Sequence, residues 1–191
     1  RYEFKNKGID VFIDAMGQLN RNNGLGKEVL AFILVPAGHA GANKELLHNL
    51  ELPYQAVTST DLYLTHYLND SANDPVMNRI RAQKLRNSEE DKVKIFFVPS
   101  YLNGDDGVLN MPYYDLLVGM DLTAFPSYYE PWGYTPLESL AFKVPTITTT
   151  LAGFGLWVKE HYNMNHPGIE VIHREDGDAS NVATAIAEWV K

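Results

Sequence analysis

The sequence contains no cysteine, which excludes a disulfide framework and a thiolate-ligated metal site. It also lacks an apolar run of membrane-spanning length, and no signal peptide is visible. We therefore expect a cytoplasmic protein with no membrane partner.

An excess of basic residues is missing as well, because the net charge at pH 7 is -8. A protein that binds nucleic acid generally needs a basic field, so we expect no nucleic-acid partner. An anionic ligand would have to be held by local positive groups against the overall charge.

The 191 residues are enough for one domain with a sizeable core, and 45% of them are hydrophobic. Strand-like runs alternate with segments of helical periodicity from end to end. This alternation predicts an α/β fold with a parallel sheet and right-handed crossovers, in a single domain over residues 1–191. The expected strands cover residues 29–35, 93–98, 122–126, 144–150 and 168–173.

Several local features predict individual elements. Apolar residues at helical spacing predict a helix over residues 7–20, with Asn6 as its N-cap. A similar spacing suggests a helix over residues 62–68, and Asp74-Pro75 is expected to start a further helix. The run of residues 29–35 is continuous and apolar, which predicts a strand buried on both faces. Residues 153–155, Gly-Phe-Gly, indicate only a turn.

The stretch FPSYYEPWGYTPLES, residues 125–139, begins as a strand that Pro126 ends, and a helix follows. Thr135 suits the N-cap of that helix, and Pro136 suits its first position. Glu138 then falls where the acid of a capping box reaches back to the cap. We therefore predict that this helix starts at Thr135.

The residues before this predicted helix suggest an anion site. Gly133 allows a tight turn or a close approach to a ligand. The amides of Gly133, Tyr134 and Thr135 would point outward from a helix N-terminus, where phosphate groups bind readily. A bound diphosphate would repel Glu130, so we expect this carboxylate to face hydroxyl groups instead.

These residues carry a resemblance to a known family. Glu130 and Glu138, within YEPWGYTPLES, resemble the paired-glutamate motif of retaining glycosyltransferases with two Rossmann-like halves, the GT-B architecture. The longer string SYYEPWGYTP resembles the glycogen synthases of the animal and fungal type, glycosyltransferase family 3. RYEFKNKGIDVFIDAM, DPVMNRIRAQKLRN and PTITTTLAGFG fit the same family, in order, so the resemblance covers most of the chain.

The resemblance implies that residues 1–191 are the Rossmann-like C-terminal half of a GT-B enzyme, excised from a longer two-domain protein. This half binds the donor UDP-glucose, and the enzyme transfers glucose to the non-reducing end of an α-1,4-glucan with retention of configuration. The glucan is held through the N-terminal domain. The full-length protein is expected to be a homo-oligomer, with no metal and no cofactor.

The resemblance also implies roles for individual residues. The cations of Arg1 and Lys7 neutralise the diphosphate, Glu130 meets the donor glucose, and Glu138 meets the ribose. Further expected contacts to the donor are made by Leu102 and Tyr113 at uracil, by Trp132 beside the sugar, and by Gly133, Tyr134 and Thr135 at the phosphates. From the residues alone, the same positions fit surface cations, a packed loop leucine, a helix-start tyrosine and a capping box.

Two other functions are compatible with the pattern. One is a non-catalytic module that binds a nucleotide or a glucan, and the other is a related GT-B transferase with a different donor or acceptor. The full paired-glutamate loop and the opening cations argue against the first, and the YEPWGYTP string disfavours the second. We expect residues 1–191 alone to bind UDP or UDP-glucose weakly and to transfer no glucose. Preference for UDP over ADP rests on the resemblance.

Overall fold

The computed structural model describes residues 2–22, 25–52, 62–162 and 167–191. The chain packs as two compact units. Unit 1 comprises Arg1–Tyr2 and Leu19–Tyr113, and unit 2 comprises Glu3–Gln18 and Tyr114–Lys191. Each unit combines parallel strands with helices, which confirms the predicted α/β class. The assignment of residues 1–191 to one domain stays a prediction.

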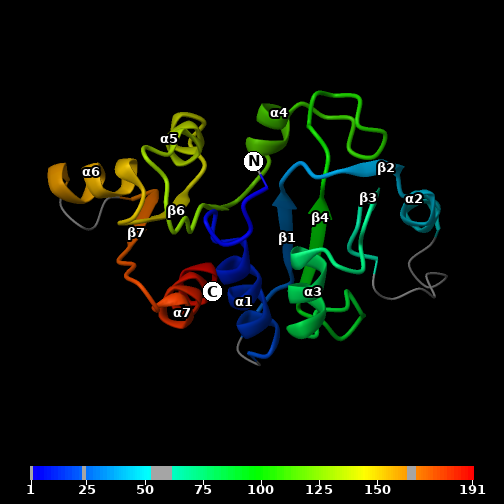
Figure 1. Ribbon diagram of the computed structural model, residues 1–191, viewed down its shortest axis with the longest axis horizontal. Helices are drawn as coiled ribbons and strands as arrows, with labels where there is room; N and C mark the ends of the chain where they lie inside the picture. Colours follow the sequence, from blue (N-terminus) through cyan, green and yellow to red (C-terminus); the bar gives the residue numbers. More distant parts are fainter. Residues whose placement is uncertain (1, 23–24, 53–61, 163–166) are drawn as a thin grey trace. The chain divides into compact units, whose positions relative to one another are not determined.

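Unit 1 is built on a parallel strand pair, β1 (Val29–Leu34) and β4 (Val93–Val98), which lie side by side in Figure 1. Both strands were expected from their apolar runs. Ala31 and Ile33 of β1 are buried, whereas Leu30 is 62% exposed. The prediction that β1 is buried on both faces is therefore wrong, because successive side chains point to opposite faces and only one face is covered.

The segment predicted as a helix over residues 62–68 is extended instead. Leu64 pairs in parallel with Phe97 of β4, and β3 (His66–Leu68) pairs antiparallel with β2 (His39–Ala42). Hydrogen bonding to β4 is available along this segment, and it outweighs the apolar spacing that suggested a helix. Tertiary context overrides local pattern here.

In the described part of unit 1, two helices begin at side-chain caps. α2 (Lys44–Glu51) follows Asn43, whose side-chain oxygen accepts hydrogen bonds from two first-turn amides. α3 (Pro75–Ala82) follows Asp74, which accepts from the amide of Met77 at 2.9 Å. The predicted start of a helix at Asp74-Pro75 is confirmed.

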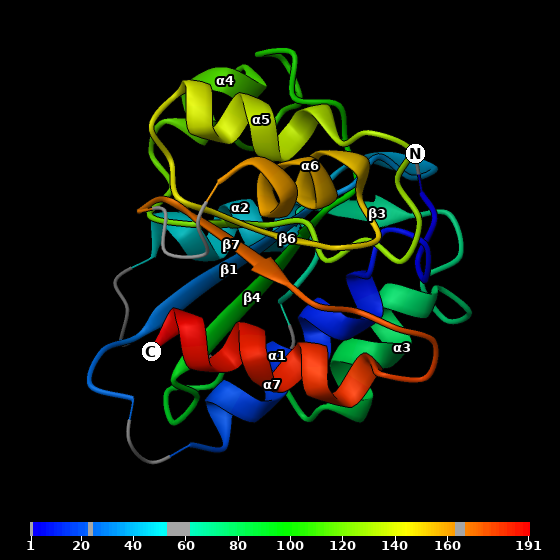
Figure 2. The same cartoon turned by 90° about the vertical axis from the view of Figure 1, so that its left-hand side faces the viewer.

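Unit 2 contains a three-stranded parallel sheet in the order β5-β6-β7. The strands are β5 (Thr123–Ala124), β6 (Thr146–Thr149) and β7 (Ile169–Ile172), each shorter than its predicted range. The helices whose residues belong wholly or mainly to unit 2 are α1 (Ile9–Asn20), α4 (Tyr113–Leu117), α5 (Tyr134–Ala141), α6 (Gly153–His161) and α7 (Ala179–Val190). Figure 2 shows α5 and α6 on one side of β6 and β7, with α7 on the other.

The prediction that residues 153–155 form only a turn is wrong, because they open α6. A Cβ atom at Gly153 would lie 2.2 Å from the carbonyl oxygen of Pro131, and one at Gly155 would lie 2.2 Å from that of Thr149. The two glycines therefore permit close packing of this helix against the neighbouring backbone. Phe154 and Val158 then pack on Ile169 of β7. The sequence shows the glycines but not the carbonyl groups that require them.

Candidate functional site

The loop that follows β5 carries Glu130 and is held by hydrogen bonds from several elements of unit 2. The Thr149 hydroxyl donates to the carbonyl of Ser127 at 2.7 Å. The amide of Glu130 donates to the carbonyl of Leu151 at 3.3 Å, and the carbonyl of Glu130 accepts from the amide of Gly153 at 3.0 Å. The carboxyl ends of β5 and β6 therefore position this loop, as is usual for ligand sites in parallel sheets.

The opening segment of unit 2 closes against the same loop. Gly8 has φ +68°, and a Cβ atom there would lie only 1.8 Å from the carbonyl oxygen of Pro126. The carbonyl of Asn6 accepts a hydrogen bond from the amide of Tyr128 at 2.8 Å. Asn6 and Gly8 thus hold residues 6–8 against the Glu130 loop.

The predicted start of α1 is wrong in its details. The helix begins at Ile9, and the carbonyl of Gly8 accepts its first hydrogen bond, from Phe12 at 3.0 Å. Asn6 is therefore not the N-cap, and Lys7 lies in the turn before the helix rather than in its first turn.

Lys7 and Glu130, two residues predicted for the site, form an ion pair between Nζ and Oε2. The two side chains are 32% and 24% exposed. Ion pairs near solvent contribute on the order of 1 kcal/mol or less, so this pair can be exchanged for ligand contacts at little cost. The geometry supplies one cation and one carboxylate at adjacent points of an open surface.

The helix after the loop starts earlier than predicted. α5 begins at Tyr134, and its N-cap is Gly133 with φ +99°, without a side-chain cap hydrogen bond. The predicted cap at Thr135 and the capping box of Glu138 are therefore wrong. Pro136 occupies the third helical position rather than the first, which is tolerated because the amides of the first turn have no intrahelical acceptor.

The corrected start keeps the predicted donor amides at the helix N-terminus. Gly133, Tyr134 and Thr135 precede Pro136, which has no amide hydrogen to offer. A Cβ atom at Gly133 would lie 3.4 Å from Cγ of Glu130, so the turn and the glutamate are neighbours. The N-terminus of α5 and the Lys7–Glu130 pair thus belong to one surface of unit 2.

Trp132 lies between these features. Its carbonyl accepts a hydrogen bond from the amide of Phe154 at 2.6 Å, and its ring meets that of Phe154 edge to face at 5.9 Å. The residue is still 36% exposed. Trp132 is anchored by packing and presents part of its surface to solvent beside Glu130.

Glu138 lies within α5 and accepts a hydrogen bond from the hydroxyl of Tyr114 at 3.2 Å. This bond, together with the negative charge of Glu138, raises the pKa of Tyr114. The ring of Tyr114 stacks on Phe142 at 5.1 Å. The carboxylate predicted for the ribose therefore has a hydroxyl partner on the surface of unit 2.

The two residues predicted for uracil belong to unit 1, and the structure brings them together. The carbonyl of Leu102 accepts a hydrogen bond from the amide of Tyr113 at 3.0 Å, and Asn103 pairs with Pro112. Residues 103–112 thus form a loop closed at its neck beside Leu102 and Tyr113. Arg1, the remaining predicted residue, lies outside the described residues.

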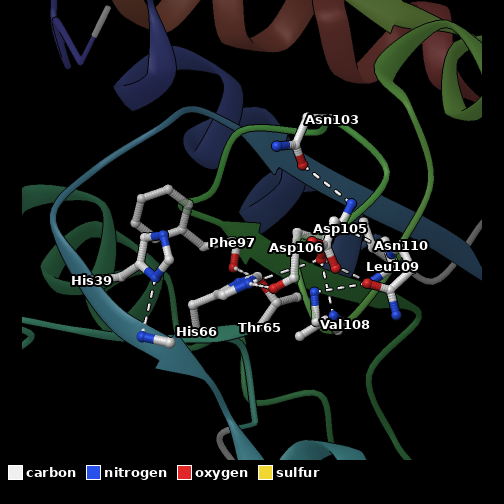
Figure 3. Close-up of polar contacts among 12 residues, drawn as sticks. His39, Thr65, His66, Phe97, Asn103, Asp105, Asp106, Val108, Leu109 and Asn110 are labelled. Carbon is white, nitrogen blue, oxygen red and sulfur yellow. Dashed lines mark hydrogen bonds and ion pairs between the residues drawn. The ribbon is translucent and has the colours of Figure 1, made fainter.

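A buried histidine that the sequence analysis missed supports this loop (Figure 3). His66 is fully buried, and its Nε2 donates to the carbonyl of Asp106 at 2.7 Å while Nδ1 lies 2.9 Å from the hydroxyl of Thr65. Its ring meets that of His39 edge to face at 4.7 Å. Burial, and then the nearby His66, lower the pKa of His39. The only signal in the sequence is a histidine inside an apolar segment.

Asp106 organises the interior of the same loop. Its carboxylate accepts hydrogen bonds from the amides of Val108, Leu109 and Asn110 at 2.8–3.0 Å (Figure 3). Burial acts to raise the pKa of Asp106, but these amide bonds outweigh it and leave the pKa below its usual value.

Two possible features are not found in the part of the chain that the structure describes. No group of three or more histidine, aspartate or glutamate side chains there could hold a metal ion. Within the same residues, none of the helices has the length and hydropathy needed to cross a bilayer.

Comparison with known proteins gives one consistent family. The family model for glycogen synthase matches residues 50–191. All of this chain aligns with glycogen [starch] synthase isoform 2 of Saccharomyces cerevisiae at 31% identity, covering 37% of that protein, and with glycogen [starch] synthase of Neurospora crassa at 30%, covering 35%. The liver glycogen [starch] synthase of Rattus norvegicus is 30% identical over 84% of this chain and 30% of its own length. The chain spans about a third of the length of these relatives. It belongs to the glycogen synthase family.

Proposed function

We propose that this chain is the donor-binding half of a retaining glycosyltransferase, a glycogen (starch) synthase. The proposed reaction transfers glucose from UDP-glucose to the non-reducing end of an α-1,4-glucan. The observation that carries the proposal is the convergence of Lys7, Glu130 and the N-terminus of α5 on one surface. A cation and the amides of a helix N-terminus suit a diphosphate, and an adjacent carboxylate suits sugar hydroxyls.

The costly step of the reaction is departure of UDP from the anomeric carbon, because negative charge grows on the leaving phosphate. Fixed positive groups at that point stabilise the transition state more than the bound donor. Lys7 and the amides of Gly133, Tyr134 and Thr135 supply them, and Arg1 adds a second cation. These groups offset the phosphate charge, so the proposal includes neither a metal ion nor another cofactor.

The other predicted residues bind the remaining parts of the donor. Glu130 accepts hydrogen bonds from the glucose hydroxyls once Lys7 turns to the phosphate, and Trp132 walls the sugar. Glu138 accepts from the ribose. Leu102 and Tyr113 hold the base, for which an apolar wall and an aromatic face are suited.

The proposal extends to the context of the chain. The glucan acceptor binds through a further, N-terminal domain, and the reaction takes place in the cytoplasm in a homo-oligomer. Residues 1–191 alone bind the donor weakly and transfer no glucose, because a two-domain transferase reacts between its halves.

Titration calorimetry with UDP, ADP and UDP-glucose tests the proposal. We expect the full-length protein to prefer UDP over ADP, and Lys7→Ala to weaken UDP binding by about tenfold or more, since bonds between charged groups contribute roughly 1.5–3 kcal/mol. Lys5→Ala is the matched control, because Lys5 lies on the same segment but is exposed. Equal losses in both variants would refute the role of Lys7.

Enzyme assays separate the proposed function from a binding module. Glucosyl transfer from UDP-glucose to glycogen by the full-length protein supports the proposal. Tight binding of UDP or a glucan without transfer, under conditions where a known glycogen synthase is active, would assign the chain to a non-catalytic role.

A further inference from the structure

Arg174 is a buried cation in unit 2 to which the proposed function gives no role. It follows β7 and is only 5% exposed. Its Nη1 donates to the carbonyl of Pro126, and its guanidinium lies 5.3 Å from the centre of the Tyr128 ring. Burying a cation is costly unless it is hydrogen-bonded and compensated, so this placement requires a structural reason.

The surroundings of Arg174 compensate its charge from two helices. Burial lowers the pKa of the guanidinium, whereas the carboxylates of Asp10 and Asp178, at the starts of α1 and α7, act to raise it. The amide of Arg174 also donates to the hydroxyl of Thr150 at 3.0 Å. Both the main chain and the side chain of Arg174 are therefore fixed.

Arg174 binds the Glu130 loop at a point where other segments of unit 2 also contact it. The carbonyl of Pro126 is also the group against which Gly8 closes. Tyr128, which lies under the guanidinium, donates through its amide to Asn6 and through its hydroxyl to Asp176. Arg174 thus contacts the Glu130 loop where the Lys7 segment meets it.

We infer that Arg174 is a positioning residue that holds Glu130 in place. It anchors Pro126 and Tyr128, and Glu130, two residues after Tyr128, is thereby placed beside Lys7. A guanidinium suits this task because it is planar and can donate to a carbonyl while it covers an aromatic face. The consequence for sugar binding rests on the proposed function, whereas the structural role does not.

Amide hydrogen exchange on the full-length protein tests the structural role. In Arg174→Gln we expect the amides of Tyr128 and Glu130 to exchange at least about tenfold faster, because a hydrogen bond from a charged donor is lost. The amides of Thr146 and Thr150, bonded to Gly168 and Ile172, should keep their rates. Arg174→Lys should show a smaller increase, since lysine keeps a donor but not the planar stack.

The control for this comparison is Lys159→Gln, which removes a cation from α6 in the same unit. Unchanged exchange in the loop of Arg174→Gln would overturn the inference. Equal acceleration at Thr146 and Thr150 would also overturn it, because it would show general destabilisation. If Arg174→Gln does not fold, Arg174→Lys decides by the same criteria.

The ratio of affinities for UDP-glucose and UDP provides a second readout. Only the glucose is expected to touch Glu130, so Arg174→Lys should weaken UDP-glucose binding several-fold and leave UDP binding unchanged. A ratio equal to that of the native protein would overturn the inferred effect on Glu130. A native protein that binds neither nucleotide would refute the proposed function, while the exchange experiment would still decide the role of Arg174.

Discussion

Two loops of this protein follow the carboxyl ends of parallel strands, and they are stabilised in different ways. The loop of residues 103–112 in unit 1 is stabilised largely from within, because Asp106 caps three amides within four residues of itself, and His66 adds one bond from a distant segment. The Glu130 loop in unit 2 is fixed from a distance, since Lys7 and Arg174 reach it from 123 residues before Glu130 and 48 residues after Pro126. A loop of the first kind depends mainly on its own residues, whereas one of the second kind requires contacts from the rest of the folded unit.

The largest loss of stability is expected from a substitution in the opening segment of unit 2, which contacts the Glu130 loop. Gly8→Ala should destabilise the protein by roughly 3 kcal/mol or more, because it combines a steric clash with strain at positive φ. Gly177→Ala is the matched control, since Gly177 has φ +82° and a Cβ atom added there would meet nothing within 4 Å. It should cost only about 1 kcal/mol. Denaturant unfolding measures both, and equal losses would disprove the close fit at Pro126.

A substitution in the loop of residues 103–112 should reduce the free energy of unfolding by less. Asp106→Asn should reduce the free energy of unfolding by about 1 kcal/mol, because the amide oxygen can still accept from Val108 and Leu109 but the amide of Asn110 loses its acceptor. The pKa of Asp106 is lowered in the folded state, so its stabilising effect is complete above the unfolded pKa of about 4 and is lost as the pH falls through the folded value. The native protein should therefore lose more stability than the variant on acidification below about pH 4.

Asp91→Asn serves as a comparison for this pH effect. Burial acts to raise the pKa of Asp91, but hydrogen bonds from Asn20, Ser88 and Arg86 outweigh it and lower the pKa. Like Asp106→Asn, the Asp91→Asn variant should therefore lose less stability than the native protein on acidification. It should not affect the loop of residues 103–112. A native protein and an Asp106→Asn variant with parallel acid-unfolding curves would contradict the prediction.

The smallest effect on stability is expected at the Lys7–Glu130 pair. Lys7→Ala should change the free energy of unfolding by less than about 1 kcal/mol, because the pair is partly exposed. The double variant Lys7→Ala, Glu130→Gln should lose little more stability than Lys7→Ala alone. A large loss in thermal or denaturant unfolding would show that the pair supports the fold rather than serving an exchangeable ligand site.

The sequence predicted the positions of β1 and β4 well and the starts of several helices poorly. The apolar run of β4 and the Asp74-Pro75 start of α3 depend on nearby residues, and both predictions are confirmed. The start of α5 was placed at Thr135, because the best cap by composition stood there. Gly133 takes that position instead, through a backbone conformation that composition does not reveal.

The residues at and around the candidate site also differ in how far the sequence indicated them. The motif residues, from Lys7 to the paired glutamates, could be proposed from the sequence because the motifs that carry the family resemblance span them. His66 and Arg174 were missed, because neither has a motif and each acts through a carbonyl distant in the chain. A buried polar residue of this kind is recognised only when its partner is known.

The α/β class could be predicted from apolar periodicity, and the family and the residues of the proposed chemistry from the resemblance that four separate motif strings carry. The folded structure was needed to show that Lys7 meets Glu130, that Leu102 meets Tyr113, and that Arg174 contacts the Glu130 loop within unit 2. The physical reason is that close approach of backbone groups and burial of a charge depend on elements far apart in the chain, which local sequence does not encode.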